Sequence, residues 1–213
     1  MLRLHGFCQS GNTFKVAFLL NALGQSWEPV HVDYMHGMTR DASWRSEANA
    51  MGEVPVLDDG ALRLTQSGVI LSYLAKKFGA FGGQGDDQQR EVLRWILFDN
   101  HKFTSYFASY RFMKAFGAQP PEPAVMAWLR GRLDASFAIV DQHLGTRPYL
   151  VGDTPTIADF SLCGYLFYPV EESGYPIAPR FPHIAAWVER MRAVDGWASP
   201  YDVLPGPRLP VRW

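Results

Sequence analysis

The sequence predicts an α/β first half followed by an all-α second half. Strand and helix patterns alternate up to about residue 78, a glycine-rich stretch follows at 79–87, and only helical patterns come after it. We therefore expect an α/β domain over residues 1–78, a linker over residues 79–87, and an all-helical domain over residues 88–213 with an irregular tail.

Composition narrows the class of protein. The chain has 213 residues, of which 47% are hydrophobic and 19% charged, as in ordinary globular proteins. Its 20 basic and 21 acidic residues leave no basic excess for a nucleic-acid partner. No apolar run approaches the roughly 18 residues that span a bilayer, and the start lacks a signal-peptide pattern. We expect neither a nucleic-acid nor a membrane partner.

Cysteine and histidine usage points to a reducing compartment without a metal site. Cys8 and Cys163 lie far apart and form no CxxC pair, so a disulfide framework is not expected. The six histidines show no spacing typical of metal ligands. The sequence therefore predicts a cytoplasmic protein with no bound metal.

The element order predicted for the first half is βαβαββα. Gly24 ends the first helix, and Asp58-Asp59-Gly60 is the turn expected between the last two strands. A βαβ unit implies a parallel strand pair, and a hairpin adds an antiparallel one, so a small mixed sheet is expected. The predicted elements are strands at 2–4, 30–32, 54–57 and 61–64, and helices at 13–23, 40–45 and from 67 onward.

The second half shows four helical patterns and no strand. Prolines 120, 121 and 123 separate the first two helices, and Thr156-Ile157-Ala158-Asp159 predicts a capping box at the start of the third. The helices are expected at 90–115, 125–144, from 156 and from 182. The proline-containing tail at 205–213 has no regular pattern.

Val54-Pro55 stands where a strand should begin. Proline lacks the N–H that a sheet requires, so this position predicts an edge strand, a bulge or a cis peptide bond. A cis bond would turn the backbone of Val54 outward, where an extended peptide can pair with it. The alternative is a trans proline at a strand start.

Gln66-Ser67 stands at the start of the next predicted helix. A helix N-terminus presents free N–H groups and partial positive charge, which suit a carboxylate ligand. Ser67 adds a hydroxyl donor, and Gln66 can donate and accept. The alternative is that Ser67 only caps the helix.

A third feature, Ser10 to Val16, joins the first strand to the first helix. Hydroxyls here would lie at the carboxyl edge of the sheet beside a helix N-terminus, which favours an anion such as a thiolate. Helix capping by Ser10, Asn12 or Thr13 is the alternative.

Four motifs occur in the order typical of a known family. They are Ser10-Gly11-Asn12 with Lys15-Val16, residues 49–56 (NAMGEVPV), residues 66–70 (QSGVI) and residues 152–159 (GDTPTIAD). Together they resemble a cytosolic glutathione S-transferase of the serine type, similar to bacterial members. The resemblance covers nearly the whole chain and implies a thioredoxin-like N-terminal domain, an all-α C-terminal domain, a homodimer and glutathione as cosubstrate.

The resemblance also implies roles for particular residues. Glutathione would pair with the backbone of Val54 beside a cis Pro55, and its γ-glutamyl carboxylate would bind Gln66 and Ser67. Ser10 would donate a hydrogen bond to the glutathione thiolate. That thiolate would then attack a hydrophobic electrophile, a small-molecule partner.

Two residues depart from the family pattern. Glu53 stands where relatives often carry Lys or Gln to meet the glycine carboxylate of glutathione, so Arg40 or Lys15 would have to supply the positive charge. Cys8 lies two residues before Ser10, whereas some classes use a cysteine of this loop to form mixed disulfides.

Residues of the first long helix are candidates for the electrophile pocket. Tyr106, Tyr110 and Arg111 would face the cleft or a dimer interface in such a fold, and Asn12 would approach the same pocket from the first helix. A place in the helical core is an equally good interpretation of each aromatic residue.

Three functions are compatible with these features. The leading one is a glutathione transferase. The second is a glutathione-dependent disulfide reductase or peroxidase, for which Cys8 would be the working residue. The third is a non-catalytic ligand-binding or scaffold protein of the same fold, to which Glu53 lends support.

Overall fold

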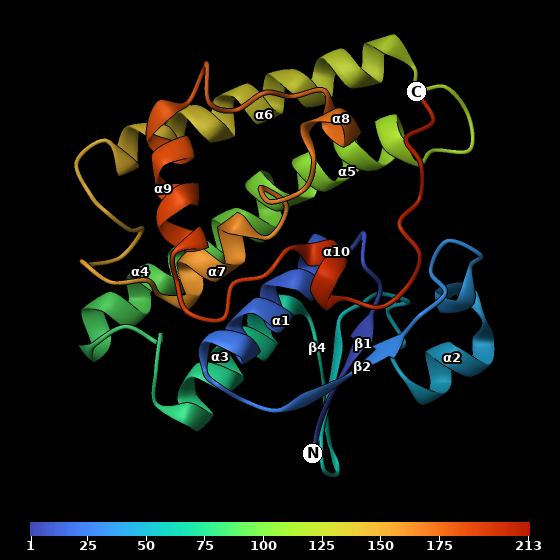
Figure 1. Ribbon diagram of the computed structural model, residues 1–213, viewed down its shortest axis with the longest axis horizontal. Coiled ribbons are helices and arrows are strands. Elements are labelled where there is room, and N and C mark those ends of the chain that lie inside the picture. Colours follow the sequence, from blue (N-terminus) through green and yellow to red (C-terminus); the bar gives the residue numbers. More distant parts are fainter. The chain divides into compact units, whose positions relative to one another are not determined.

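A computed structural model describes all 213 residues, which divide into two compact units (Figure 1). The α/β unit consists of Met1–Gly82 together with Val194–Arg208, and the helical unit of Gly83–Ala193 together with Leu209–Trp213. This corrects the expectation that all of residues 88–213 belong to the helical domain. Residues 194–208 return to the α/β unit because they pack on its first helix.

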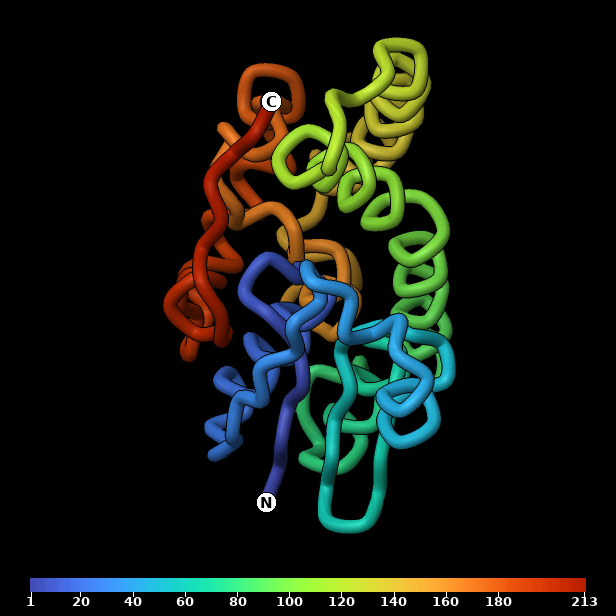
Figure 2. Tube along the Cα trace, turned by 90° about the vertical axis from the view of Figure 1, so that its right-hand side faces the viewer, coloured from blue at the N-terminus to red at the C-terminus, as the bar shows by residue number.

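The α/β unit is built on a four-stranded mixed sheet with the order β2-β1-β3-β4. β1 pairs in parallel with β2 and antiparallel with β3, and β3 pairs antiparallel with β4. The β3–β4 hairpin is the teal loop at the bottom of Figure 2. The predicted mixed sheet is therefore confirmed. The strands are β1 (Leu2–Gly6), β2 (Trp27–His31), β3 (Val56–Asp59) and β4 (Leu62–Thr65).

The hairpin turn lies two residues later than predicted. Asp58 and Asp59 belong to β3, where they lie opposite Arg63 and Leu62, and Gly60 enters the turn with a φ of 62°. The hydroxyl of Tyr73 donates to the Asp59 carboxylate over 2.6 Å. Both aspartate carboxylates therefore have hydrogen-bond partners while their residues belong to the strand, and neither residue is needed to form the turn.

Two long helices of the α/β unit, α1 (Gly11–Ala22) and α3 (Ser67–Phe78), pack against each other. α1 is buried on nearly every side, since all its residues from Thr13 to Leu20 are buried. The short helix α2 (Ala42–Glu47) follows the 3-10 turn η1 (Met38–Arg40), and Trp44 packs against Val32 and Val56 of the sheet region.

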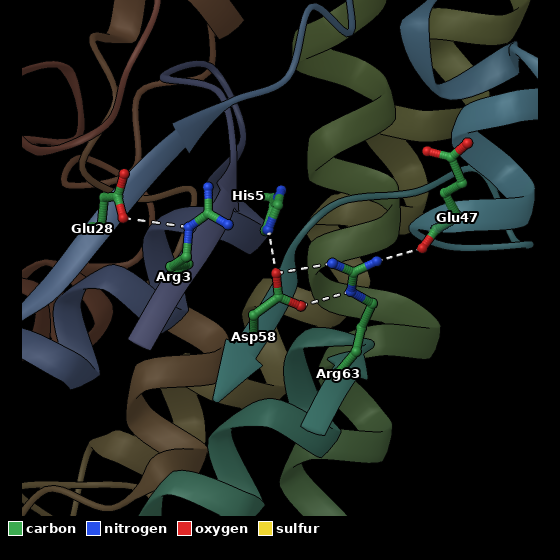
Figure 3. Close-up of polar contacts among 6 residues, drawn as sticks. All are labelled: Arg3, His5, Glu28, Glu47, Asp58 and Arg63. Atoms are coloured by element: carbon green, nitrogen blue, oxygen red, sulfur yellow. Dashed lines mark hydrogen bonds and ion pairs between the residues drawn. The ribbon is translucent and has the colours of Figure 1, made fainter. Parts of the chain in front are cut away.

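A polar network crosses the sheet near α2, as Figure 3 shows. Asp58 accepts from Arg63 Nε over 2.6 Å and from Arg63 Nη2 over 2.9 Å, and its Oδ2 lies 2.8 Å from His5 Nε2. Arg63 Nη1 donates to the backbone carbonyl of Glu47, the last residue of α2. The hydrogen bond from Arg63 is the main reason that the pKa of Asp58 falls to about 2, although burial opposes it.

The C-terminal part of the α/β unit follows α1 from its end to its beginning. Gly196 approaches the end of α1 so closely that an added Cβ would lie 2.5 Å from the carbonyl carbon of Asn21. Helix α10 (Pro200–Val203) contacts α1 (Figure 1). The carbonyl of Pro205 then accepts a hydrogen bond from the loop before α1.

The helical unit contains no strand, as predicted, and seven helical segments where four helices were expected. α4, the π-helical turn η2 and α5 follow one another without a break, and α5 lies beside α6 (Figure 1). None of the helices combines the length and apolar character needed to cross a membrane. The segments are α4 (Gly85–Phe98), η2 (Asp99–Phe103), α5 (Thr104–Ala115), α6 (Pro123–Leu144), α7 (Ile157–Cys163), α8 (Val170–Ser173) and α9 (Pro182–Arg192).

The predicted capping box opens α7. Asp159 Oδ2 accepts from the backbone N–H and the hydroxyl of Thr156, and Oδ1 accepts from Leu150 N over 3.0 Å and from Trp187 Nε1 over 2.9 Å. Full burial raises the pKa of Asp159 to about 6, although these four hydrogen bonds oppose the rise. One carboxylate thus joins α7, the loop before it and α9.

Candidate active site

The Val54-Pro55 peptide bond is cis, one of the geometries that the strand-initial proline predicts. The register between β1 and β3 begins at Val56, opposite His5, so Val54 lies just outside the ladder. Its backbone N–H and C=O are therefore not used by the sheet. Pro55 is buried and Val54 half-buried.

The loop before Val54 is held by the side chain of Asn49. Asn49 Nδ2 donates to the carbonyl of Glu53 over 2.8 Å, and Asn49 Oδ1 accepts from the N–H of Met51 over 3.0 Å. Asn49 is itself 6% exposed. This side chain thereby sets the path of residues 49–53 toward the cis peptide bond.

The start of α3 differs in one detail from the prediction. Gln66, not Ser67, is the N-cap residue, and no side chain caps the helix. Ser67 is the first helical residue and is 5% exposed. The first-turn N–H groups of this 12-residue helix therefore carry no side-chain acceptor, which leaves them available to a carboxylate.

Gln66 has an uncommon backbone conformation. Its φ of 67° lies in the left-handed region, where residues other than glycine are rare and often found at ligand clamps. Its side-chain Nε2 donates to Glu53 Oε2 over 2.8 Å and approaches Met51 Sδ at 3.2 Å. Residues 49–55 and residues 66–67 together are called the half-site here. Contacts between side chains thus join its two parts.

The charged residues to consider at this half-site are Glu53 and two candidate cations, Lys15 and Arg40. Glu53 is exposed and places a carboxylate at the edge of the loop. Of the two cations expected to offset it, Lys15 is fully buried within α1, and Arg40 is exposed at the end of η1. Arg40 is therefore the candidate that a ligand can reach.

Ser10 is the N-cap residue of α1. Its Oγ accepts from Thr13 N over 3.1 Å and from Thr13 Oγ1 over 3.0 Å. A serine hydroxyl has one donor hydrogen and two acceptor lone pairs, so both lone pairs are used and the hydrogen remains for another acceptor. Capping and thiolate binding, the two interpretations of this serine, are therefore compatible.

Both halves of the chain match models of a known protein family. The model of the glutathione S-transferase N-terminal domain matches residues 1–76, and that of the C-terminal domain matches residues 101–195. The chain belongs to the glutathione S-transferase family.

Individual known proteins are similar to three quarters or more of the chain. A glutathione S-transferase from Xanthobacter autotrophicus has a solved structure with a TM-score of 0.85 and 31% identity, covering 95% of this chain and 98% of that one. Glutathione S-transferase F14 of Arabidopsis thaliana is 27% identical over 99% of this chain and 89% of its own length. A maleylacetoacetate isomerase of Rhizobium meliloti is 32% identical over 75% of this chain and 77% of its own length.

The thioredoxin-like N-terminal domain and all-α C-terminal domain expected of a glutathione S-transferase are confirmed. Neither cysteine of this family member is accessible, since Cys8 and Cys163 are both 0% exposed. Cys8 lies under the carbonyls of Gly206 and Pro207, each 3.4 Å from its sulfur. The structure therefore does not support Cys8 as the working sulfur of a reductase.

Two residues expected in the electrophile pocket are buried within the helical unit. Arg111 is 3% exposed and donates through Nε to Glu172 Oε2 over 2.8 Å, while its guanidinium lies 3.8 Å from the ring centroid of Tyr168. Tyr110 is 7% exposed and packs edge-on against Tyr175. Contact of these two residues with an electrophile stays a prediction, because helical spacing alone does not separate a buried face from a pocket face.

The other two pocket candidates are less enclosed. Tyr106 is half-buried, with its ring edge-on to Trp128 at a centroid distance of 5.8 Å. Asn12 lies in the first turn of α1, and its buried Oδ1 has no hydrogen-bond partner. Both therefore remain candidates for contact with a ligand.

Three residues make contacts around the site that were not expected from the sequence. Thr13 donates twice to Ser10, Asn49 holds the loop before Val54, and Arg63 fixes the end of α2. Asn49 had a usable signal, because an asparagine that bonds the N–H two residues on is a common turn device. Arg63 had none, since its bond to α2 joins residues 16 apart.

Proposed function

We propose that this glutathione transferase uses Ser10 to hold the glutathione thiolate and residues 54–67 to hold the peptide. The observation that carries the proposal is the hydrogen bonding of Ser10. Thr13 donates to both lone pairs of the hydroxyl oxygen, so the hydroxyl hydrogen is available to a further acceptor. A thiolate is an acceptor, and α1 behind it adds the field of a helix N-terminus.

The energy required is within reach of these groups. A free thiol titrates near 8.5, so lowering its pKa by about two units needs about 2.7 kcal/mol of preferential thiolate stabilisation. A hydrogen bond to a charged acceptor supplies about 1.5–3 kcal/mol, and a helix terminus about 0.3–1 kcal/mol. Ser10 then acts as a donor and not as a base.

The peptide part of glutathione is assigned to the half-site. The free backbone N–H and C=O of Val54 would pair with it like an added strand, beside Pro55. The γ-glutamyl carboxylate would accept from Ser67 and from the uncapped N–H groups of α3, with Gln66 beside it. Arg40 is the partner proposed for the glycine carboxylate, which Glu53 opposes.

The chemical step follows from this placement. The thiolate sulfur forms a bond to an electrophilic carbon of a hydrophobic small molecule, and the leaving group departs with the electron pair of the broken bond. The proton released when the thiol ionises goes to solvent. Neither Cys8 nor Cys163 takes part, so the reductase alternative has no exposed cysteine on which to act.

A homodimer in the cytoplasm is part of the same proposal. Leu93 and Leu97 lie one turn apart on α4 and are 54% and 61% exposed, although large aliphatic side chains are usually buried. A second copy of the chain is the partner proposed for this face. Sedimentation of wild type and Leu97→Asp tests it, with a dimer expected only for wild type.

The activity test compares glutathione with a thiol that lacks its peptide groups. Wild type should conjugate glutathione to a chloronitroarene and give no acceleration with 2-mercaptoethanol. Ser10→Ala should lose most of the activity, whereas Ser26→Ala, an exposed serine after the other end of α1, should keep it. Full activity in Ser10→Ala would refute the catalytic assignment, and failure to bind glutathione would favour the scaffold alternative.

A further inference from the structure

Three residues near the C-terminus, Pro205 to Pro207, bond to the loop that leads into Ser10. The carbonyl of Pro205 accepts from the N–H of Cys8 over 2.9 Å, and the carbonyl of Pro207 accepts from Gln9 Nε2 over 2.7 Å. The Cys8 sulfhydryl lies 3.4 Å from the carbonyl oxygens of Gly206 and Pro207. Each of these contacts uses a backbone carbonyl of the C-terminal segment.

Gly206 fits this position because it has no side chain. Its φ of 104° lies in the region that favours glycine, and an added Cβ would lie 2.8 Å from His31 Nε2 and 3.9 Å from Cys8 Sγ. The segment therefore lies tightly between the end of β2 and the loop.

The loop has its own contacts on either side of these bonds. The Phe7 ring stacks on Tyr34 at a centroid distance of 4.8 Å, and the N–H of Ser10 donates to the carbonyl of Phe7 over 3.0 Å. Between these two points, Cys8 and Gln9 are the residues that the C-terminal segment holds. Both are buried, at 0% and 6% exposure.

We propose that Pro205-Gly206-Pro207 is a positioning segment for the Ser10 hydroxyl in the transferase reaction. The inference rests on the proposed function, because it gives the segment a purpose only if Ser10 holds the thiolate. It acts through Gln9 and Cys8 and touches no reacting atom. A displacement of about 1 Å in a group that stabilises a reacting atom can lower a rate by about 100-fold, so the loop needs this restraint.

The inference predicts separate effects on reaction and on binding. Residues 49–67, which are proposed to hold the peptide of glutathione, receive no bond from the segment. Loss of the segment should therefore raise the pKa of the bound thiol and lower kcat, while the Kd for S-methylglutathione stays unchanged. A general loss of folding would instead weaken both.

Two truncations of the full chain test the segment. A chain ending at Arg208 keeps the segment and loses only residues 209–213, and a chain ending at Leu204 loses both. The first should keep wild-type kcat. The second should show a thiol pKa about one unit higher and kcat about ten-fold lower. Equal kcat and equal thiol pKa in the two truncated proteins would overturn the inference.

A side-chain variant decides the question even if the shorter truncation fails to fold. Gln9→Ala removes the 2.7 Å bond to Pro207, and kcat should fall about three- to five-fold with KM for glutathione unchanged. Gln25→Ala is the matched control, since Gln25 Nε2 bonds to the Leu23 carbonyl at the other end of α1. Equal kcat in Gln9→Ala, Gln25→Ala and wild type would overturn the inference.

These outcomes separate the inference from the proposed function. If wild type itself neither binds S-methylglutathione nor conjugates glutathione, the proposed function fails. If wild type is active and Ser10→Ala is not, yet Gln9→Ala and the chain ending at Leu204 match wild type, only the positioning role fails.

Discussion

Two stretches of the α/β unit, the Ser10 loop and residues 49–67, are held in different ways. Residues 49–67 are held by near neighbours, since Asn49 bonds to Glu53 and Glu53 to Gln66. The Ser10 loop is held by Pro205 and Pro207, nearly 200 positions away in the sequence. The difference indicates that peptide binding and thiolate positioning rest on separate contacts, so mutations should separate them.

The largest difference between an effect on kcat and an effect on glutathione binding is expected at Ser10. Ser10→Ala removes the one donor assigned to the thiolate, and kcat should fall about 100-fold, the usual effect of losing one such donor. The Kd for S-methylglutathione should stay within about two-fold of wild type, because the peptide contacts are intact. Stopped-flow turnover and calorimetric binding measure the two quantities. A change of equal size in both would show that the stretches are not independent.

The second effect concerns Arg63, which pairs with Asp58 and bonds to the end of α2. Helix α2 leads into residues 49–53. The pKa of Asp58 is lowered to about 2 from 3.8, so its contribution to stability is present above about pH 4 and is lost as the pH falls toward 2. The contribution is at most about 2 kcal/mol, and salt reduces it because Arg63 is 40% exposed.

Arg63→Met should therefore flatten the acid limb of the unfolding free energy between pH 4 and pH 2. Urea unfolding at a series of pH values measures it. Arg3→Met is the control, since Arg3 pairs with Glu28 (Figure 3) and is 47% exposed. The same acid limb in Arg63→Met and wild type would contradict the assignment of the Asp58 pKa to Arg63.

The third effect should appear in binding alone. Ser67→Ala removes the hydroxyl assigned to the γ-glutamyl carboxylate, and KM for glutathione should rise about ten-fold with kcat at saturation unchanged. Ser72→Ala is the matched control, because Ser72 lies on the same helix and bonds to the Gly68 carbonyl. A fall in kcat in Ser67→Ala would place this serine in the reaction as well.

The smallest effect is expected from Glu53, whose negative charge is unfavourable for binding the glycine carboxylate. Glu53→Gln removes a carboxylate opposed to the glycine carboxylate while keeping an acceptor for Gln66, so KM for glutathione should fall about two- to three-fold. Glu47→Gln changes the net charge equally without altering the half-site, since Arg63 bonds only to the backbone of Glu47. A KM raised by Glu53→Gln would show that Glu53 helps binding.

The same contrast between near and distant contacts explains which features of the fold and the site could be predicted from the sequence. The special peptide bond before Pro55, the helix start at Ser67 and the capping box of Thr156 and Asp159 were predictable, because each depends on residues a few positions apart. The C-terminal segment was not, since its contacts use backbone carbonyls that any residue possesses.

Pairs of charged residues that lie on different elements of one unit were also not evident from the sequence. Asp58 was assigned to a turn because the sequence does not reveal that Arg63 and His5 would pair with it in a strand. Nothing near Arg111 in the sequence identifies Glu172 as its buried partner. In both residues the decisive contact is with a charge on another element.

The most direct test of the account is the pKa of the thiol of bound glutathione. Ultraviolet titration of the thiolate in the binary complex should give a pKa about two units below the free value of about 8.5 in wild type. In Ser10→Ala it should return to above about 8 while glutathione stays bound. A bound thiol whose pKa equals the free value in wild type, or is unchanged by Ser10→Ala, would contradict the assignment of Ser10 to the thiolate.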